Sequence, residues 1–291
     1  MRRIKLLLVA IVALTVLGAT DIFAQERFGL ERRGGHYFFA TTINDVPADL
    51  MVESGIPALL VGESVYEKCL IESEITFEPS QQKIRLLNKL YDIIYRAEGV
   101  VKIGNAEYDG PIFVLADYDG VSIPIQYLKD AASKRRVVTV DLSEGYLQVG
   151  EATKCRGAEK FRLSFDKELG FPLVKASVRI TTSKGRANVK GNLIVDFGNP
   201  SLLFLLKQHA SLTKAIENGE IELKDAYNKQ GEVVAQGIYA NDVYLFGREY
   251  HDTSIGVTDK MQSIKQLGFL GTRFFSSPVV FDFDKGTMLI Q

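Results

Sequence analysis

The sequence predicts a mainly β protein built from two copies of one lobe. Beyond the first two dozen residues, apolar residues alternate with polar ones, and β-branched and aromatic residues are frequent, which is typical of strands. Residues 36–52 and 171–195 each read as two strands joined by a turn. Each pair leads directly into an acidic residue that is followed two positions later by glycine, Glu53-Ser54-Gly55 in the first and Asp196-Phe197-Gly198 in the second.

Two features of the sequence recur at nearly the same spacing, namely the acidic residue before glycine and a strand–turn–strand segment at the end of each lobe. The acidic residues Glu53 and Asp196 are 143 positions apart. Residues 138–149 and 279–290 align without a gap and place Asp141 on Asp282, 141 positions away. Because landmarks at both ends of the unit agree within two positions, we interpret the chain as an internal duplication.

The first residues have the features of a signal peptide. Arg2 and Arg3 give a basic start, residues 6–18 form an apolar run, and Ala24 supplies the small residue of a cleavage position. The apolar run is shorter than the roughly twenty residues that a transmembrane helix needs. We therefore expect residues 1–24 to be removed and the protein to be exported, periplasmic or secreted, with no membrane span after cleavage.

The rest of the chain divides into three parts. We expect an N-terminal lobe over residues 25–149, a more polar link over 150–170 and a C-terminal lobe over 171–291. Each lobe is long enough to bury a core of its own.

Two segments raise the question of helix or strand. Residues 201–219 are the best helix candidate, with a glycine stop at Gly219. Residues 80–98 fit either a helix or a pair of strands, and the periodicity does not decide between them. The lobes are otherwise expected to contain few helices.

Composition excludes several classes of function. With 46% hydrophobic residues and a net charge of −1, the chain has the balance of a soluble domain and no electrostatic reason to bind nucleic acid. Three scattered histidines give no metal-ligand spacing, and no glycine-rich phosphate loop is present, so we expect neither a metal nor another cofactor. Cys69 and Cys155 are either a disulfide or two buried thiols. We expect a monomer.

The turn formed by a strand, an acid, a small residue and glycine resembles the loop with which aspartic proteases present their carboxylates. Residues 51–61 (MVESGIPALLV) and 193–205 (LIVDFGNPSLLFL) are similar to the two copies of the retropepsin and pepsin motif. Residues 269–271 (FLG) resemble the segment that completes the ψ-shaped loop around the acid. The resemblance implies a mainly antiparallel, bilobal fold of the closed-barrel acid-protease type, with a cleft between the lobes for a peptide or protein ligand.

The same resemblance implies a set of site residues. Transferred onto this sequence, the catalytic pair is Glu53 and Asp196, two carboxylates that would lie about 3 Å apart and share one proton. One would act as general base on a water, and the other would protonate the substrate carbonyl. The motif residues that support this pair are Ser54, Gly55, Phe197, Gly198 and Gly271.

The chain departs from the family pattern at several of these positions. Glu53 carries one methylene more than aspartate. Phe197 replaces a residue whose hydroxyl would hydrogen-bond across the lobe junction, a bond that Ser54 in the other copy could still make. Residues 119–128 stand where the first lobe would carry its own glycine motif. Both loops continue into proline, at Pro57 and Pro200, and lose an amide donor there.

These departures leave three interpretations open. The leading one is an exported pseudopeptidase that binds a peptide-like ligand in its cleft, because aspartate is lost in one copy and a hydroxyl in the other. The alternative is an active, atypical aspartic endopeptidase with a Glu53/Asp196 pair. The third is a non-enzymatic structural protein of the cell envelope.

The neighbours of the acids receive structural interpretations. Ser54 is expected to hydrogen-bond locally and Phe197 to pack. Tyr91, Tyr95 and Tyr108 lie where such a lobe carries a flap over the cleft, although each is better explained as a half-buried strand residue.

Overall fold

A computed structural model describes residues 26–86, 89–150, 157–227 and 229–291 of the chain. The expected signal peptide and Cys155 lie outside the described residues. Cys69 is a buried, free thiol. Among the helices that the structure describes, none combines the length and the apolar composition needed to span a membrane.

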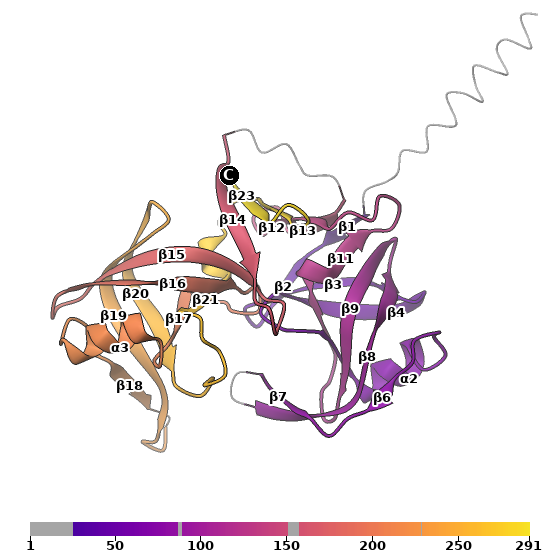
Figure 1. Ribbon diagram of the computed structural model, residues 1–291, viewed down its shortest axis with the longest axis horizontal. Helices are drawn as coiled ribbons and strands as arrows, with labels where there is room; N and C mark the ends of the chain where they lie inside the picture. Colours follow the sequence, from indigo (N-terminus) through magenta and orange to yellow (C-terminus); the bar gives the residue numbers. More distant parts are fainter. Residues whose placement is uncertain (1–25, 87–88, 151–156, 228) are drawn as a thin grey trace, which may run out of the picture.

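The protein is mainly β and has two lobes that lie side by side, as the sequence predicts (Figure 1). The first lobe contains a sheet in the order β11-β9-β5-β10-β4-β3-β8-β6, with β2 added at β3 and β7 at β8. Its strands are β2 (Glu31–Arg33), β3 (His36–Ile43), β4 (Val46–Glu53), β5 (Leu59–Gly62), β6 (Glu78–Pro79), β7 (Lys83–Leu86), β8 (Lys89–Ile103), β9 (Ala106–Leu115), β10 (Val121–Pro124) and β11 (Leu128–Asp130).

The second lobe repeats this arrangement of strands. Its strands are β15 (Pro172–Thr181), β16 (Arg186–Val195), β17 (Leu203–Leu206), β18 (Lys224–Tyr227), β19 (Val233–Leu245), β20 (Arg248–Thr258) and β21 (Gly268–Leu270). The predicted hairpins are β3–β4 and β15–β16. Asn44 and Asp45 join β3 to β4 with φ values of 48° and 67°, the left-handed conformation that a two-residue hairpin turn requires.

A six-stranded section of a 13-stranded sheet, with the order β1-β13-β12-β22-β23-β14, joins the two halves of the chain. Its strands are β1 (Glu26–Gly29), β12 (Val137–Asp141), β13 (Tyr146–Val149), β14 (Glu159–Phe165), β22 (Val279–Asp282) and β23 (Thr287–Ile290). At its centre β12 pairs antiparallel with β22, so the two aligned landmark segments of the sequence lie against each other. Strand β14 falls within the segment predicted as the link and pairs with both β23 and β15.

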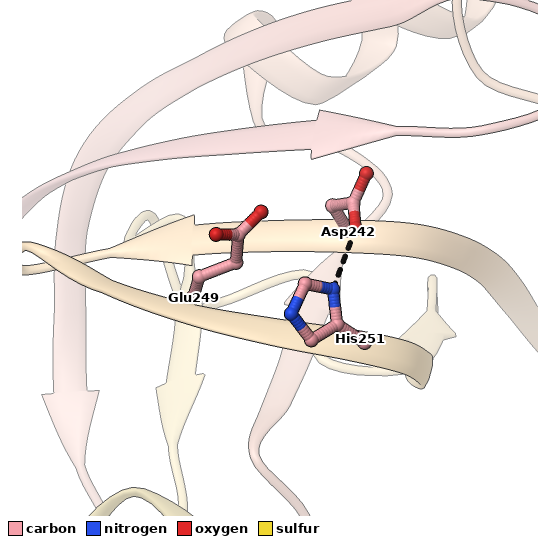
Figure 2. A group of neighbouring side chains, drawn as sticks. All are labelled: Asp242, Glu249 and His251. Carbon is pink, nitrogen blue, oxygen red and sulfur yellow. Dashed lines mark hydrogen bonds and ion pairs between the residues drawn. The ribbon is translucent and has the colours of Figure 1, made fainter.

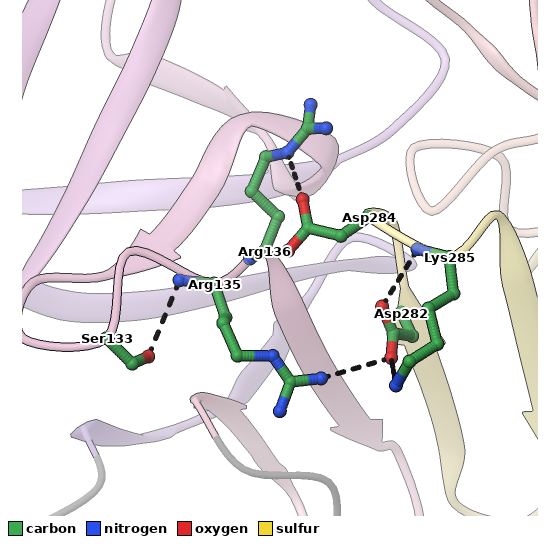
Figure 3. Close-up of polar contacts among 6 residues, drawn as sticks. All are labelled: Ser133, Arg135, Arg136, Asp282, Asp284 and Lys285. Carbon is green, nitrogen blue, oxygen red and sulfur yellow. Dashed lines mark hydrogen bonds and ion pairs between the residues drawn. The ribbon is translucent and has the colours of Figure 1, made fainter.

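Ion pairs reinforce the junction beside β12 and β22 (Figure 3). The Arg135 guanidinium lies 3.2 Å from a carboxylate oxygen of Asp282, which also contacts the Lys285 ammonium at 2.7 Å. Arg136 donates from Nε and from its backbone N–H to Asp284, both at 2.9 Å. These contacts connect the segment before β12 to the turn between β22 and β23.

Within the described ranges, helices are few and short. They are α2 (Glu63–Cys69), α3 (Ala210–Glu217) and the 3-10 turns η1 (Ile125–Tyr127) and η2 (Thr272–Phe274). The helix predicted over 201–219 is wrong in its first half, because Leu203–Leu206 form the buried strand β17 between β20 and β21. Its predicted stop is confirmed, since Gly219 follows α3 with a φ of +72°. The ambiguous segment 80–98 forms strands β7 and β8.

Candidate active site

The two acid-bearing loops occupy equivalent places in the two lobes. In the first lobe β10 pairs parallel with β4, which ends at Glu53, and antiparallel with β5. In the second lobe β21 pairs parallel with β16, which ends one residue before Asp196, and antiparallel with β17. Each acid therefore lies at the end of a central strand, at the point where the chain turns away from the sheet.

The carboxylates of Glu53 and Asp196 are brought together, and each lies against the glycine of the opposite loop. A Cβ atom added at Gly55 would lie 2.6 Å from Oδ1 of Asp196. A Cβ atom added at Gly198 would overlap both carboxylate oxygens of Glu53. The extra methylene of Glu53 thus carries its carboxylate across the junction, and the absence of a side chain at Gly198 leaves room for it.

Both acids are held by amide donors and by each other. The N–H of Gly198 donates to Oδ1 of Asp196 at 3.0 Å, and Asp196 also accepts from Gly55. Glu53 accepts from the N–H groups of Ser54 and Gly198, and the two carboxyl groups are hydrogen-bonded to each other. A direct hydrogen bond between two carboxyl groups requires that one of them carries a proton.

Burial is the main electrostatic influence on this pair. It raises the pKa of Asp196 to about 6. Burial, followed by the charge of Asp196 and their hydrogen bond, raises the pKa of Glu53 well above its usual value. Two adjacent buried carboxylates cannot both ionise easily, so the pair exchanges protons as a unit.

Ser54 ties the two loops together. Its hydroxyl donates to the carbonyl of Val195 at 2.7 Å and accepts from the N–H of Phe197 at 3.1 Å. The expectation of a local hydrogen bond for Ser54 is wrong, because both partners lie in the other lobe, and Ser54 makes the cross-lobe bond that the sequence allowed for it. One hydroxyl therefore satisfies two backbone groups across the junction.

Phe197 packs, as expected. Its ring is fully buried, stacks on Phe275 with centroids 5.0 Å apart and meets Phe281 edge to face. The side chain is therefore directed into the aromatic core of the second lobe. The hydroxyl that the family places here is replaced by apolar contacts rather than by another polar group.

The first lobe completes its loop without the glycine motif. Pro124 is paired in register with Glu53, at the place where the second lobe has Gly271. The Gln126 amide nitrogen donates to the carbonyls of Ser54 and Ile56 at 3.2 and 3.3 Å. A buried side-chain amide thus holds the Glu53 loop, and no sequence signal singled out Gln126 beforehand.

In the second lobe the glycine is required. A Cβ atom at Gly271 would overlap the carbonyl oxygen of Ser201 and lie 2.5 Å from that of Asn199. The N–H of Gly271 donates to Leu202 at 3.0 Å, and the N–H of Thr272 donates to Asn199 at 2.8 Å. The Asp196 loop is consequently fixed by backbone hydrogen bonds.

Glu53 and Asp196 lie on the wall of a cavity of about 560 Å³ between the lobes. The first lobe contributes apolar residues from the Glu53 loop and from the β7–β8 hairpin, whereas the second contributes three phenylalanines and the segment around Ile264. The principal apolar lining residues are Ile56, Leu60, Ile84, Leu86, Phe171, Phe204, Ile264 and Phe269. The cavity has the size and the apolar walls typical of an organic ligand site.

Of the three tyrosines considered for a flap, only Tyr91 lines the cavity. It lies on the β7–β8 hairpin and meets Tyr118 edge to face, with ring centroids 5.5 Å apart. Tyr118 also lines the cavity and hydrogen-bonds Ser122, and burial raises its pKa to about 12. Tyr95 stacks on Tyr66 elsewhere in the lobe. Tyr108 is fully buried and donates to Pro111, which makes it a core residue.

A separate group of potential metal ligands lies on the β19–β20 ribbon (Figure 2). The ligand atoms of Asp242, Glu249 and His251 are within 4.8 Å of one another. Asp242 and His251 face each other across the strand pair, and Nδ1 of His251 lies 2.8 Å from Asp242. None of these residues lines the cavity described above.

Comparison with known proteins gives a structural relationship only. No protein-family model matches the sequence. No curated protein sequence matches it either. Among solved structures, the chain is similar to the aspartic proteinase from Irpex lacteus, with a TM-score of 0.54 and 12% sequence identity over 91% of this chain and 96% of that one. The chain therefore has the aspartic-proteinase fold.

Proposed function

We propose that the protein is an aspartic-type peptide hydrolase that uses Glu53 and Asp196. The observation that carries the proposal is the pair of carboxyl groups, hydrogen-bonded to each other on the wall of the cavity between the lobes. A pair that shares a proton supplies a base and an acid at one place, which is what hydrolysis of an amide requires.

The division of roles is set by the two environments. In this proposal Glu53 holds the shared proton and Asp196 ionises first, because burial raises the pKa of both groups and the charge of Asp196 raises the pKa of Glu53 further. Ionised Asp196 would take a proton from a water as its oxygen attacks the substrate carbonyl carbon. Glu53 would give its proton to the carbonyl oxygen, which forms a tetrahedral gem-diol. Asp196 would then pass the proton that it took from water to the amine nitrogen, and Glu53 would take back a hydroxyl proton as the C–N bond breaks, which leaves a carboxylic acid and a free amine.

The departures from the family pattern are compatible with this chemistry. The longer Glu53 side chain reaches its position because Gly198 leaves space for it. The missing hydroxyl at Phe197 removes one of the two cross-lobe contacts, while Ser54 retains the other. These observations support the active alternative over the degenerate one.

The leading interpretation from the sequence remains the second candidate. A pseudopeptidase would bind an extended peptide in the same cavity without cleaving it, and the replacement of aspartate by Glu53 favours it. Misplacement of a catalytic group by about 1 Å can lower a rate roughly a hundredfold. Export and a structural role in the envelope stay predictions.

A direct experiment distinguishes the peptide hydrolase from the pseudopeptidase. A peptide library is incubated with the wild-type protein from pH 4 to pH 9, and cleavage is monitored by mass spectrometry. We expect hydrolysis that is lost in Asp196→Ala and in Glu53→Gln. A folded wild-type protein that cleaves no peptide at any pH would reject the hydrolase and leave the peptide-binding candidate.

A further inference from the structure

The charges around the cavity are unbalanced. Apart from Glu53 and Asp196, no acidic side chain among the described residues lines it. Three cations do, namely Lys83 and Arg85 from strand β7 and Lys260 from the second lobe. Cations therefore outnumber acids among the lining residues, although Lys83 and Lys260 also contact other groups of the protein.

Strand β7 presents its cations on one face. Ile84 and Leu86 are half-buried and pack against the apolar cluster that contains Ile56 and Leu60. Lys83 and Arg85, which alternate with them, are exposed. Because successive strand residues point to opposite faces, the apolar pair fixes the hairpin on the first lobe and leaves the cations on the other side. In Figure 1, β7 lies in the gap between the lobes.

Arg85 differs from Lys83 in its partner. Lys83 lies opposite Asp92 on β8 and contacts its carboxylate at 2.6 Å. Arg85 lies opposite Leu90, and the part of the chain that the structure describes gives it no carboxylate partner. Arg85, as a residue that lines the cavity, is therefore available to a ligand, and the planar fork of its guanidinium suits a carboxylate.

We propose that Arg85 selects peptides that carry an acidic side chain. This inference rests on the proposed function, since it takes the cavity as the site of a peptide. The carboxylate of a bound Glu or Asp would accept hydrogen bonds from the Arg85 guanidinium while apolar residues of the peptide contact the walls. The positive charge of Arg85 would also attract acidic peptides and disfavour basic ones.

The test measures binding independently of cleavage. The ligands are hexapeptides whose central peptide bond is reduced, so that it cannot be hydrolysed, and is flanked by apolar residues. Each peptide carries one Glu at one of the outer positions. A matched peptide carries Gln at the same position. Their affinities are measured by calorimetry at low salt. For at least one position, we expect the Glu peptide to bind about three- to tenfold more tightly than its Gln counterpart.

Variants test whether Arg85 causes the preference for the Glu peptide. Arg85→Gln should equalise the two affinities, and Arg85→Glu should make the Gln peptide the better ligand. Arg186→Glu, the same charge change at an exposed position outside the cavity lining, should keep the wild-type preference. Equal affinities in the wild type, a preference that persists in Arg85→Glu, or no binding of either peptide would overturn the proposal.

The proposed hydrolase is tested separately with the unreduced peptides. If they are bound with the acidic preference but not cleaved, the hydrolase fails and the role of Arg85 stands. If they are cleaved without any preference for Glu, the role of Arg85 fails and the hydrolase stands.

Discussion

At the scale of single residues, the site is defined by the hydrogen-bond donors of the Glu53 and Asp196 carboxylates. Glu53 accepts from its own loop and from the other lobe, and so does Asp196. Burial disfavours the charged form of each, so the pair retains a proton at a higher pH than an exposed carboxyl would.

The first prediction concerns the pH dependence of hydrolysis. We expect kcat/KM to be bell-shaped, with its acidic limb near pH 6, where Asp196 must ionise to serve as base. The alkaline limb should reflect the loss of the proton from Glu53, whose pKa is raised well above its usual value. The measurement is kcat/KM for one cleaved peptide from pH 4 to pH 10. A maximum near pH 3 to 4 would contradict it.

The second prediction concerns Ser54. In Ser54→Ala the buried carbonyl of Val195 and the N–H of Phe197 both lose their partner, so the free energy of unfolding should fall by roughly 1–3 kcal/mol. Urea denaturation measures it. Ser177→Ala, which removes an exposed hydroxyl bonded to Asn188, should change stability by less than about 0.5 kcal/mol. Equal losses in the two variants would show that the cross-lobe hydroxyl has no special role.

At the scale of elements, both loops depend on the parallel strand that lies beside them. Strand β10 supports the Glu53 loop and β21 supports the Asp196 loop. They differ in the segment that follows the strand, since Gln126 contributes a side-chain amide in one lobe and Gly271 permits a close backbone approach in the other. The two lobes therefore share the same strand topology around the acid, but different hydrogen bonds hold the two acid-bearing loops.

The third prediction tests the space that Gly198 provides. Gly198→Ala would put a Cβ atom onto the Glu53 carboxylate and displace it, so hydrolysis should fall by a factor on the order of 100. The control is Gly29→Ala, where an added Cβ meets nothing within 4 Å. Both variants are compared with the wild type by kcat/KM and by circular dichroism. Full activity in folded Gly198→Ala would refute the described placement of Glu53.

Sequence patterns predicted the elements better than the side-chain contacts. The hairpins β3–β4 and β15–β16 were predictable because alternation and turn residues are local signals. The run 201–219 was mistaken for one helix because a continuous apolar run such as Leu203–Leu206 is ambiguous between a helix and a buried strand. Gln126 could not be found, since nothing local reveals that its amide reaches the carbonyls of Ser54 and Ile56.

The site was predictable in its residues but not in its geometry. The repeated acid and glycine identified Glu53 and Asp196. The position of the Glu53 carboxylate could not be predicted, because no neighbouring residue in the sequence indicates how far its longer side chain extends. That Glu53 lies over Gly198 depends on how the two lobes meet. The cross-lobe hydrogen bonds of Ser54 depend on it in the same way.

At the scale of the whole molecule, the two halves are joined by one continuous sheet and by ion pairs beside it. Pairing of β12 with β22 fixes the relative position of the lobes, and the Arg135 and Arg136 contacts lie next to this pairing. The ion pairs are largely exposed, so each contributes little to stability. The hydrogen-bonded strands and the buried core carry most of the connection.

The fourth prediction links the site to global stability. Carboxyl groups whose pKa is raised on folding reduce stability when ionised, so this cost is present above pH 6 and disappears as the pH falls toward 4. Glu53→Gln removes one of the two groups whose pKa is raised on folding and should raise the unfolding free energy at pH 8 by on the order of 1–3 kcal/mol. At pH 4 it should have little effect.

Urea unfolding of Glu53→Gln and of the wild type at both pH values checks this prediction. Glu72→Gln, at an exposed site on the first lobe, serves as the control and should show no such difference between pH 8 and pH 4. A Glu53→Gln protein that is destabilised at pH 8 would indicate that Glu53 is stabilised as an anion.

The reciprocal placement of each carboxylate over the glycine of the other loop has a consequence for the history of the chain. A single ancestral lobe that dimerised would have used one loop twice, and any change in it would have altered both partners at once. Two loops within one chain can differ from each other, within the space that the opposite loop leaves. The longer acid at Glu53 is tolerated as long as the other half keeps Gly198, so each half constrains which substitutions the other can accept.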